Sequence, residues 1–393
     1  MNRIVKSLLP GLLAGAFALP AVAQDAFSTI IDEVVANDAS VAAERSRINA
    51  AIAAERAENV LPDPDVDFDY KWGRREAGDR WGVSVTQSFD WPGLYRARRN
   101  ALSERTMAME NAHSAAVADL RLETKQMLID IVLTRQQLEL LYEIKHNLDS
   151  LGRSLDKAYA GGEATVIMMR KFKHELYNVR TRIDDAESNL DALRLAIIAK
   201  NGGNYIDLGA IRDYPAEKLL AESDYLDMLE QHDSRLASLR ELEMAAEGNL
   251  KVEKMKRLPG FKLGYVHEKE GDEHFNGLTA GINLPLWSRK NALASAKENL
   301  FAAQDDNRAY KLQQTSAVMT DYALAKKLNA RSEEYAAIFG NDYTQLLQKS
   351  FFGGQMTVFE YLNEINWYME SKLDYLSLKH QQAQTMARLN KWI

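Results

Sequence analysis

The strongest constraint on the fold is an internal repeat that interrupts long stretches without proline. The phrase KAYAGGEATV at 157–166 returns as KSFFGGQMTV at 349–358, with five of ten letters identical and the glycine pairs 192 residues apart. The flanks repeat as well, since NVLPDPDVDFDYKW at 59–72 corresponds to KRLPGFKLGYVHEK at 256–269. Each half therefore reads helix, proline, strand, loop, strand, long helix, glycine break, helix.

The helical segments are unusually long. Residues 101–158 contain no proline and a single glycine, and residues 291–350 are similar in length. Leu141, Leu148 and Leu155 recur every seven residues, which predicts a coiled-coil seam against a neighbouring helix. Helices of this length, at about 1.5 Å per residue, favour a rod or a tube over a compact globule.

The strand segments alternate strictly between apolar and polar residues. In 65–72 the side chains of Val66, Phe68, Tyr70 and Trp72 face one way, and Asp65, Asp67 and Asp69 face the other. Three further segments, near 80–89, 261–268 and 277–286, behave alike. The pattern suits strands with lipid outside and water inside. It also suits a half-buried sheet in a soluble protein, so the strands alone leave both readings open.

The N-terminus and the strand count favour the first reading. Residues 1–23 look like a signal peptide, with Arg3 and Lys6, an apolar stretch at 8–19, and Ala21-Val22-Ala23 before the expected cleavage site. No cysteine is present, so the exported protein uses no disulfides. Four strands with open edges are not viable in lipid, and a symmetric oligomer must complete the barrel. Three copies would supply twelve strands.

Composition and motifs point away from nucleic acid and from catalysis. The formal net charge is −7, and no cluster of Lys and Arg is available to bind phosphates. His174-Glu175 lacks the second histidine of a zincin, and no nucleophile elbow or phosphate loop is present. The sequence therefore predicts no enzyme, no cofactor and no metal centre. The loop from His267 to His274 gathers two histidines and four acids, which leaves weak cation binding or a solvated loop as alternatives.

The duplicated plan resembles the TolC-like outer membrane efflux protein family over essentially the whole mature chain. The residues that carry the resemblance are the Leu-Pro before each half's first strand, the strand ends QSFDW and NLPLW, the paired glycine breaks and NGGNYIDL at 201–208. The segment DWPGLYRARRNAL at 90–102 leans toward the heavy-metal branch, which is CusC- and CzcC-like.

The resemblance implies a fold and a set of partners. The fold is mainly α with four strands per chain, and a homotrimer forms a twelve-stranded outer membrane β-barrel continuous with a periplasmic α-helical barrel. The repeats would span 24–205 and 206–393, with tips near 161 and 353. The expected function is a passive exit duct in a Gram-negative outer membrane, between lipid, a periplasmic adaptor and an inner-membrane pump of the RND type. Divalent or heavy-metal cations, and hence metal resistance, are among the candidate substrates.

The resemblance also assigns roles to particular residues. The adaptor-docking tips would be Tyr159, Gly161, Gly162, Phe351, Gly353 and Gly354. Glu360 and Asn363 match the periplasmic gate, although Asn363 departs from the family's acidic pattern. Asp65, Asp67 and Asp69 would line the pore. The plainer alternatives are a helix C-cap for each Gly-Gly pair and a solvated carboxylate for Glu360.

A second function class remains open from the sequence. A soluble periplasmic coiled-coil adaptor or scaffold would share the signal peptide and the heptads. It would not account for two pairs of alternating strands at equivalent places in the repeat.

Overall fold

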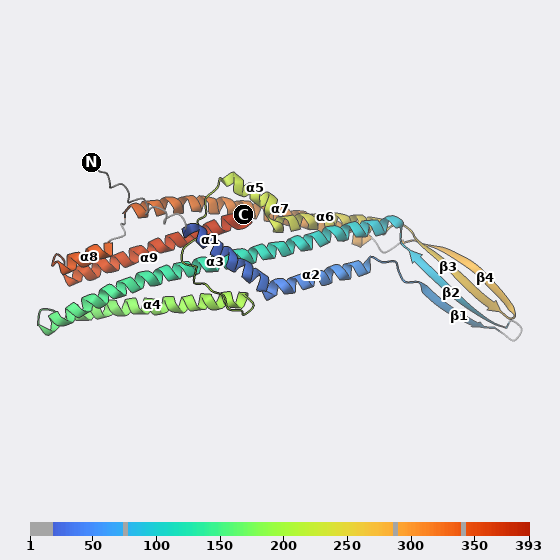
Figure 1. Ribbon diagram of the computed structural model, residues 1–393. Helices are drawn as coiled ribbons and strands as arrows, with labels where there is room; N and C mark the ends of the chain where they lie inside the picture. Colours follow the sequence, from blue (N-terminus) through green and yellow to red (C-terminus); the bar gives the residue numbers. More distant parts are fainter. Residues whose placement is uncertain (1–18, 74–77, 286–289, 339–342) are drawn as a thin grey trace, which may run out of the picture. The chain divides into compact units, whose positions relative to one another are not determined.

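The computed structural model describes residues 19–73, 78–285, 290–338 and 343–393 (Figure 1). Most of the predicted signal peptide, residues 1–18, lies outside this part. The elements in chain order are α1 (Leu19–Asn37), α2 (Ala39–Glu58), β1 (Asp65–Trp72), β2 (Asp79–Phe89), α3 (Pro92–Ala160), α4 (Val166–Lys200), α5 (Glu222–His232), α6 (Ser234–Met255), β3 (Gly260–Glu270), β4 (Glu273–Asn283), α7 (Lys290–Ile338), α8 (Tyr343–Phe352), α9 (Val358–Leu389) and the 3₁₀ turn η1 (Asn390–Trp392).

The described chain is mainly helical with one four-stranded sheet, as the sequence predicts. Helix α3 runs for 69 residues, and its proline, Pro92, stands at the first helical position, where a missing N–H is harmless. The second predicted long helix is present as α7 and α8. Residues 339–342 between them lie outside the described part.

The described residues form two compact units. Unit 1 comprises Met1–Ser40, Val117–Leu229 and Ser316–Ile393, and unit 2 comprises Val41–Ala116 and Glu230–Thr315. Neither unit coincides with a predicted repeat, because each draws on both halves of the sequence. The repeat boundaries at 24–205 and 206–393 stay predictions.

The core of unit 1 contains the predicted seam. Leu141, Leu148 and Leu155 on α3 are all buried, as are Ile144 and Leu151. Figure 1 shows α3 and α4 running side by side in opposite directions, and α8 and α9 doing the same. The heptad spacing therefore marks residues that pack against antiparallel neighbours.

A linker, residues 201–221, joins the two halves of the chain within unit 1. Its apolar side chains Ile206, Leu208 and Ile211 are buried. Arg135 on α3 donates to the carbonyl of Leu208 at 2.7 Å and also to that of Ile211. The linker is thus bound to α3 through its backbone as well as its apolar side chains.

Unit 2 contains the sheet and the helix ends next to it. The strand order is β1-β2-β3-β4, and every pair is antiparallel. The sequence places a loop at 268–276, but β3 extends to Glu270 and β4 begins at Glu273, with Gly271 at φ 60° in the turn. The alternation continues there with polar side chains, which is why the pattern looked like loop. Of the other predicted loop, 73–79, residues 74–77 lie outside the described part.

No helix among the described residues is both long enough and apolar enough to cross a membrane.

Helix α6 approaches α3 closely at a glycine. A Cβ added at Gly248 would lie 2.9 Å from Ala101 Cβ and 3.1 Å from Ala101 Cα. We expect Gly248→Ala to lower stability by about 1–3 kcal/mol, because the packed helices must separate. The measurement is the midpoint of thermal unfolding followed by circular dichroism.

The matched control is the double variant Gly248→Ala with Ala101→Gly, which restores the space. It should recover part of the lost stability. Equal midpoints for Gly248→Ala and the unmodified chain would contradict the close packing.

Candidate functional site

The first glycine turn reverses the chain between α3 and α4. Gly161 N–H donates to the Lys157 carbonyl at 3.0 Å, and Glu163 N–H donates to the Ala158 carbonyl at 2.8 Å. Gly162 has φ 78°, a conformation that a side chain disfavours, so glycine is required there. Thr165 then caps α4, its hydroxyl accepting from Met168 N–H. These bonds satisfy helix-end groups that would otherwise be unpaired.

The second glycine turn, between α8 and α9, repeats this geometry 192 residues later. Gly353 N–H donates to the Lys349 carbonyl at 2.9 Å, and Gln355 N–H donates to the Ser350 carbonyl at 3.0 Å. Gly354 has φ 74°, and Thr357 caps α9. Both turns lie at the same end of unit 1 (Figure 1). The paired phrases in the sequence therefore correspond to paired helix reversals.

The aromatic residues at the turns differ in exposure. Tyr159 is 46% exposed, whereas Phe351 is half-buried, with its ring 5.1 Å from that of Tyr361. The neighbouring Phe352 is 60% exposed. Sequence reasoning missed Phe352, because its repeat equivalent is Ala160 and the repeat gave no signal. The exposed aromatic surface of the second turn is therefore at Phe352 more than at Phe351.

Glu360 lies in the first turn of α9, where it completes a capping box. Its carboxylate accepts from Thr357 N–H at 2.8 Å, and its own N–H donates to the Thr357 hydroxyl at 3.3 Å. The bond from the Thr357 backbone lowers the pKa of Glu360, because it stabilises the charged form. The side chain is also exposed, so it remains charged and accessible. Met168, its repeat equivalent, cannot close such a box.

Asn363 contacts its own repeat equivalent. Lys171 on α4 donates to Asn363 Oδ1 on α9 at 2.8 Å, and its ammonium lies 5.2 Å from the centre of the Phe359 ring. Arg182 and Glu370 form an ion pair between the same helices, at 2.5 Å. The structure thus brings Asn363 and Lys171 together beside the turns. Sequence reasoning missed Lys171, since the contact depends on tertiary packing.

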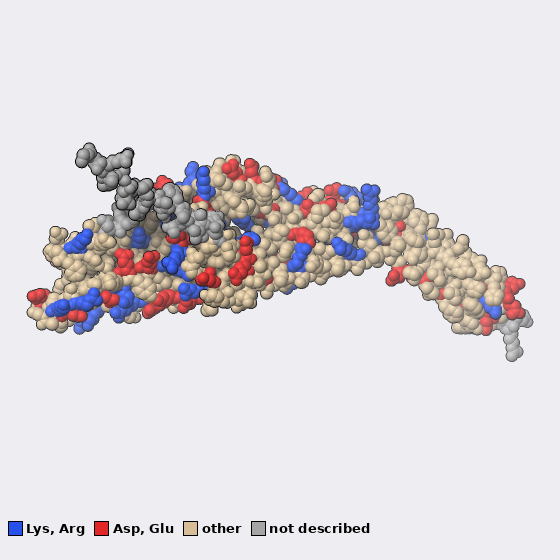
Figure 2. Space-filling view, in the orientation of Figure 1, with Lys and Arg blue, Asp and Glu red and all other residues tan. Residues whose placement is uncertain are grey.

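The sheet has one apolar face, and the strand register makes it continuous. Val66 pairs with Val85, Val85 with Tyr265, and Tyr265 with Leu278 across the four strands. Phe68 is 67% exposed and Leu278 is 89% exposed. Figure 2 shows few charged side chains on the visible face of the sheet except near the strand ends. The apolar residues of this face are Val66, Phe68, Tyr70, Trp72, Trp81, Val83, Val85, Phe89, Phe261, Leu263, Tyr265, Leu278, Ala280 and Ile282. The polar residues Gln87, His267, Lys269, His274 and Asn276 lie on the same face, four of them toward the hairpin between β3 and β4.

The opposite face of the sheet is polar and crowded. Asp65, Asp67 and Asp69 stand here, paired in register with Thr86, Ser84 and Gly82. Gly264 lies on the same face, where an added Cβ would be 2.6 Å from Thr86 and 2.7 Å from Thr279. Position 264 therefore requires a residue without a side chain.

Charged pairs gather on the polar face toward the hairpin turns. Asp69 forms an ion pair with Lys71 at 3.1 Å. Arg80 pairs with Glu268 and, at 3.6 Å, with Glu270. The three predicted aspartates thus share one face, and one of them is already neutralised by a lysine.

The two histidines of the segment from His267 to His274, for which weak cation binding and a solvated loop were the alternatives, lie on adjacent strands. The rings of His267 and His274 stack with centroids 5.5 Å apart, and His267 Nδ1 is 2.8 Å from Asn276 Oδ1. Within the described ranges, no group of three or more His, Asp or Glu side chains is arranged to hold a metal ion.

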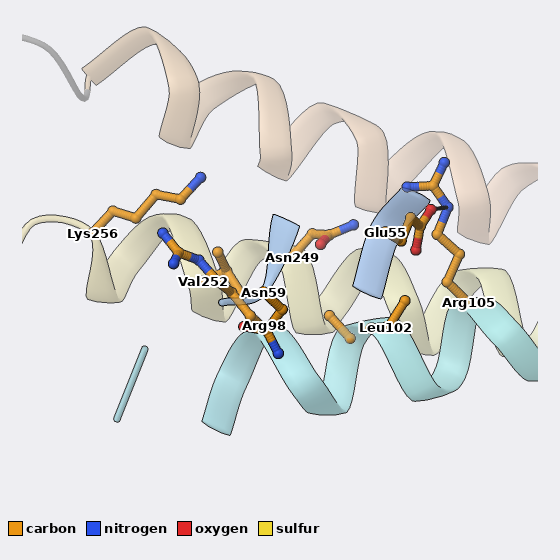
Figure 3. Close-up of a pocket in the computed structure, with 9 residues that line it drawn as sticks. Glu55, Asn59, Arg98, Leu102, Arg105, Asn249, Val252 and Lys256 are labelled. Atoms are coloured by element: carbon orange, nitrogen blue, oxygen red, sulfur yellow. Dashed lines mark ion pairs between the residues drawn. The ribbon is translucent and has the colours of Figure 1, made fainter. Parts of the chain in front are cut away.

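A cavity of about 310 Å³ lies in unit 2 between α2, α3 and α6 (Figure 3). Arg105 Nε contacts Glu55 Oε1 at 2.8 Å within it. Arg98 pairs with Asp90 at 3.0 Å, and Lys256 pairs with Glu253. Because its cations are already paired with carboxylates, this cavity shows no unmet charge that would attract a ligand.

Solved structures of outer membrane channels share this architecture. The channel OprN matches with a TM-score of 0.80 at 13% identity, over 95% of this chain and 91% of that chain. The MtrE channel of Neisseria gonorrhoeae, in its open state, matches with 0.73 at 14% identity, over 95% and 88%. CusC, whose structures concern folding and transmembrane channel formation, matches with 0.71 at 15% identity, over 94% and 92%.

The chain has the fold of outer membrane channels. The matches extend over nearly the whole length of both partners, so the fold is shared by both units and not by a fragment. The TM-score of CusC is no higher than those of OprN and MtrE, so the comparison does not favour the heavy-metal branch. No protein-family model matches the sequence, and no curated protein matches it either.

The capping box predicts how the second turn responds to pH. Because the pKa of Glu360 is lowered on folding, its stabilising contribution is present above the ordinary pKa of about 4.3 and is lost as pH falls through the folded value. Glutamine fills the same capping position without charge. Glu360→Gln should therefore lower the unfolding midpoint at pH 7, and the difference should vanish near pH 3. A difference that stays constant from pH 7 to pH 3 would contradict the role of the charge.

Proposed function

We propose that this chain is the exit duct of a tripartite efflux system in the outer membrane of a Gram-negative bacterium. The observation that carries the proposal is the sheet, with a continuous exposed apolar face on one side and a polar, glycine-containing face on the other. That arrangement suits lipid outside and water inside. The shared fold with outer membrane channels supports it.

The edges of the sheet favour a trimer. Strands β1 and β4 each have one partner within the described chain. Their outer backbone groups need partners in a membrane, where no water can satisfy them. Pairing β1 of one protomer with β4 of the next closes a ring, and three chains give the twelve strands expected for this homotrimer. Asp65, Asp67 and Asp69 would then line its pore.

The two glycine turns are proposed as the periplasmic tips. Each has a backbone exposed at a glycine pair, and exposed aromatics lie beside them, Tyr159 at the first and Phe352 at the second. Glycine lets a partner helix approach the backbone closely. The proposed partners are the hairpins of a periplasmic adaptor, which links the duct to an inner-membrane pump of the RND type.

Glu360 and Asn363 are proposed as the gate. Six tips surround one opening in the trimer, and three Glu360 carboxylates form a ring that favours cations. The capping box supports this role, because it holds the carboxylate in place and in the charged form. Divalent or heavy-metal cations are candidate substrates, and the acidic residues of the sheet are compatible with their passage.

A soluble periplasmic adaptor or scaffold is the alternative function. The apolar sheet face weighs against it, because exposed apolar patches this continuous are rare on soluble monomers.

The membrane proposal predicts opposite outcomes for neighbouring residues of β1. Phe68→Lys places a charge on the apolar face near mid-strand, at an expected cost of about 2–4 kcal/mol in a bilayer. Asp67→Lys places the same charge on the polar face and serves as the matched control. We expect Phe68→Lys to abolish the heat-modifiable outer membrane form in unboiled gels and Asp67→Lys to preserve it. Equal recovery of both variants in the soluble periplasmic fraction would contradict the proposal.

The gate proposal predicts a change in ion selectivity. Glu360→Gln removes the ring of charge and keeps the cap, so the preference for cations should fall in planar bilayers under a salt gradient. The measurement is the reversal potential, with Glu139→Gln on α3 as the control. An unchanged reversal potential in Glu360→Gln would remove Glu360 from the gate.

A further inference from the structure

A cavity of about 480 Å³ lies in unit 1, where the linker crosses helices α3 and α9. Linker residues 213–217 form one wall, and one face of α9, from Tyr375 to Met386, forms the other. The volume is typical of pockets that hold small organic molecules, which run from about 300 to 1,000 Å³. None of its lining residues belongs to the glycine turns or to the sheet.

Two buried polar groups of the lining residues have no hydrogen-bond partner in the described part of the chain. They are the Tyr214 hydroxyl and the Gln382 carbonyl oxygen, Oε1. The other end of the Gln382 amide donates to Asn329 Oδ1 at 2.5 Å, which leaves Oε1 as the unused acceptor. Burial raises the pKa of Tyr214, so its hydroxyl stays protonated and able to donate. A buried polar group without a hydrogen-bond partner costs free energy, so a ligand that supplies the missing partner gains affinity.

The lining also carries one free charge of each sign. Lys379 on α9 and Asp213 on the linker make no ion pair within the described ranges, either with each other or with another residue. Glu217, the other acid in the wall, is already paired with Lys125. Apart from Gln136 on α3, the remaining wall is mainly apolar and includes Leu376, Ala383 and Met386.

We propose that this cavity binds a short zwitterionic peptide with an apolar side chain. Its carboxylate would meet Lys379, and its ammonium would meet Asp213. A peptide N–H would donate to Gln382 Oε1, and a peptide carbonyl would accept from Tyr214. The apolar side chain would lie against Leu376 and Met386. A peptide supplies a donor, an acceptor, both charges and an apolar group together, which matches the unmet groups of the wall.

The test uses the purified full chain in amphipol and the dipeptide leucyl-4-fluorophenylalanine, observed by ¹⁹F NMR. We expect saturable binding at one site per chain. Lys379→Met and Asp213→Asn should each weaken it about tenfold, and Tyr214→Phe should weaken it about three- to tenfold. Lys327→Met, at an exposed position of α7 outside the lining, is the matched control and should leave binding unchanged.

Two further measurements separate a ligand contact from a structural role. The C-terminally amidated dipeptide should bind the unmodified chain more weakly, and Lys379→Met should bind the amide and the acid alike. Tyr214→Phe should not lower the unfolding midpoint of the free protein, because the hydroxyl has no partner to lose.

The proposal is overturned if no saturable binding occurs, as for a cavity that holds only water or is covered in the assembly. It is also overturned if Lys379→Met and Tyr214→Phe bind as the unmodified chain does. Neither outcome depends on conduction, so the duct proposal and this one fail separately.

Discussion

The structure depends on how backbone hydrogen bonds at the two edges of a four-stranded sheet are satisfied. Strands β1 and β4 each leave one side of their backbone unpaired within the described chain, and the apolar face between them is exposed. The four strands of one chain cannot both pair their own edges and cover their apolar face. We propose that strands of other copies close these edges, because lipid can cover the apolar face only if the edge backbone is paired.

The glycine turns end the helices at a defined length. At each turn a positive φ and a threonine cap reverse the chain within a few residues, with helix-end groups paired. The two turns differ in charge, because Glu360 stands where the first turn has Met168. The contact of Lys171 with Asn363 joins the helices that follow the two turns. This contact lies on the surface, beside both turns.

Much of this could be predicted from the sequence, because it is local. The alternation in 65–72 gave the faces of β1, and the leucines at 141, 148 and 155 gave the buried stripe of α3. What could not be predicted depends on tertiary pairing. Strand β2 lies in the first half of the sequence and pairs with β3 in the second half, with Thr86 opposite Gly264. No local sequence pattern specifies that partner. Lys171 and the cavity beside the linker were missed for the same reason, whereas Phe352 was missed because its repeat equivalent is Ala160. The hairpin at Gly271 was missed because polar alternation looks like a solvated loop.

The most direct test is whether a disulfide can form between β1 of one chain and β4 of another. The sequence has no cysteine, so one cysteine on β1 and one on β4 can be introduced without competing thiols. Within one chain these edge strands are separated by two intervening strands, about 14 Å, which is too far for a disulfide. We would place one cysteine at Asp67 and scan the other along β4, then oxidise native membranes. A covalent trimer on denaturing gels at one register is the predicted result. Monomers at every register would contradict the account.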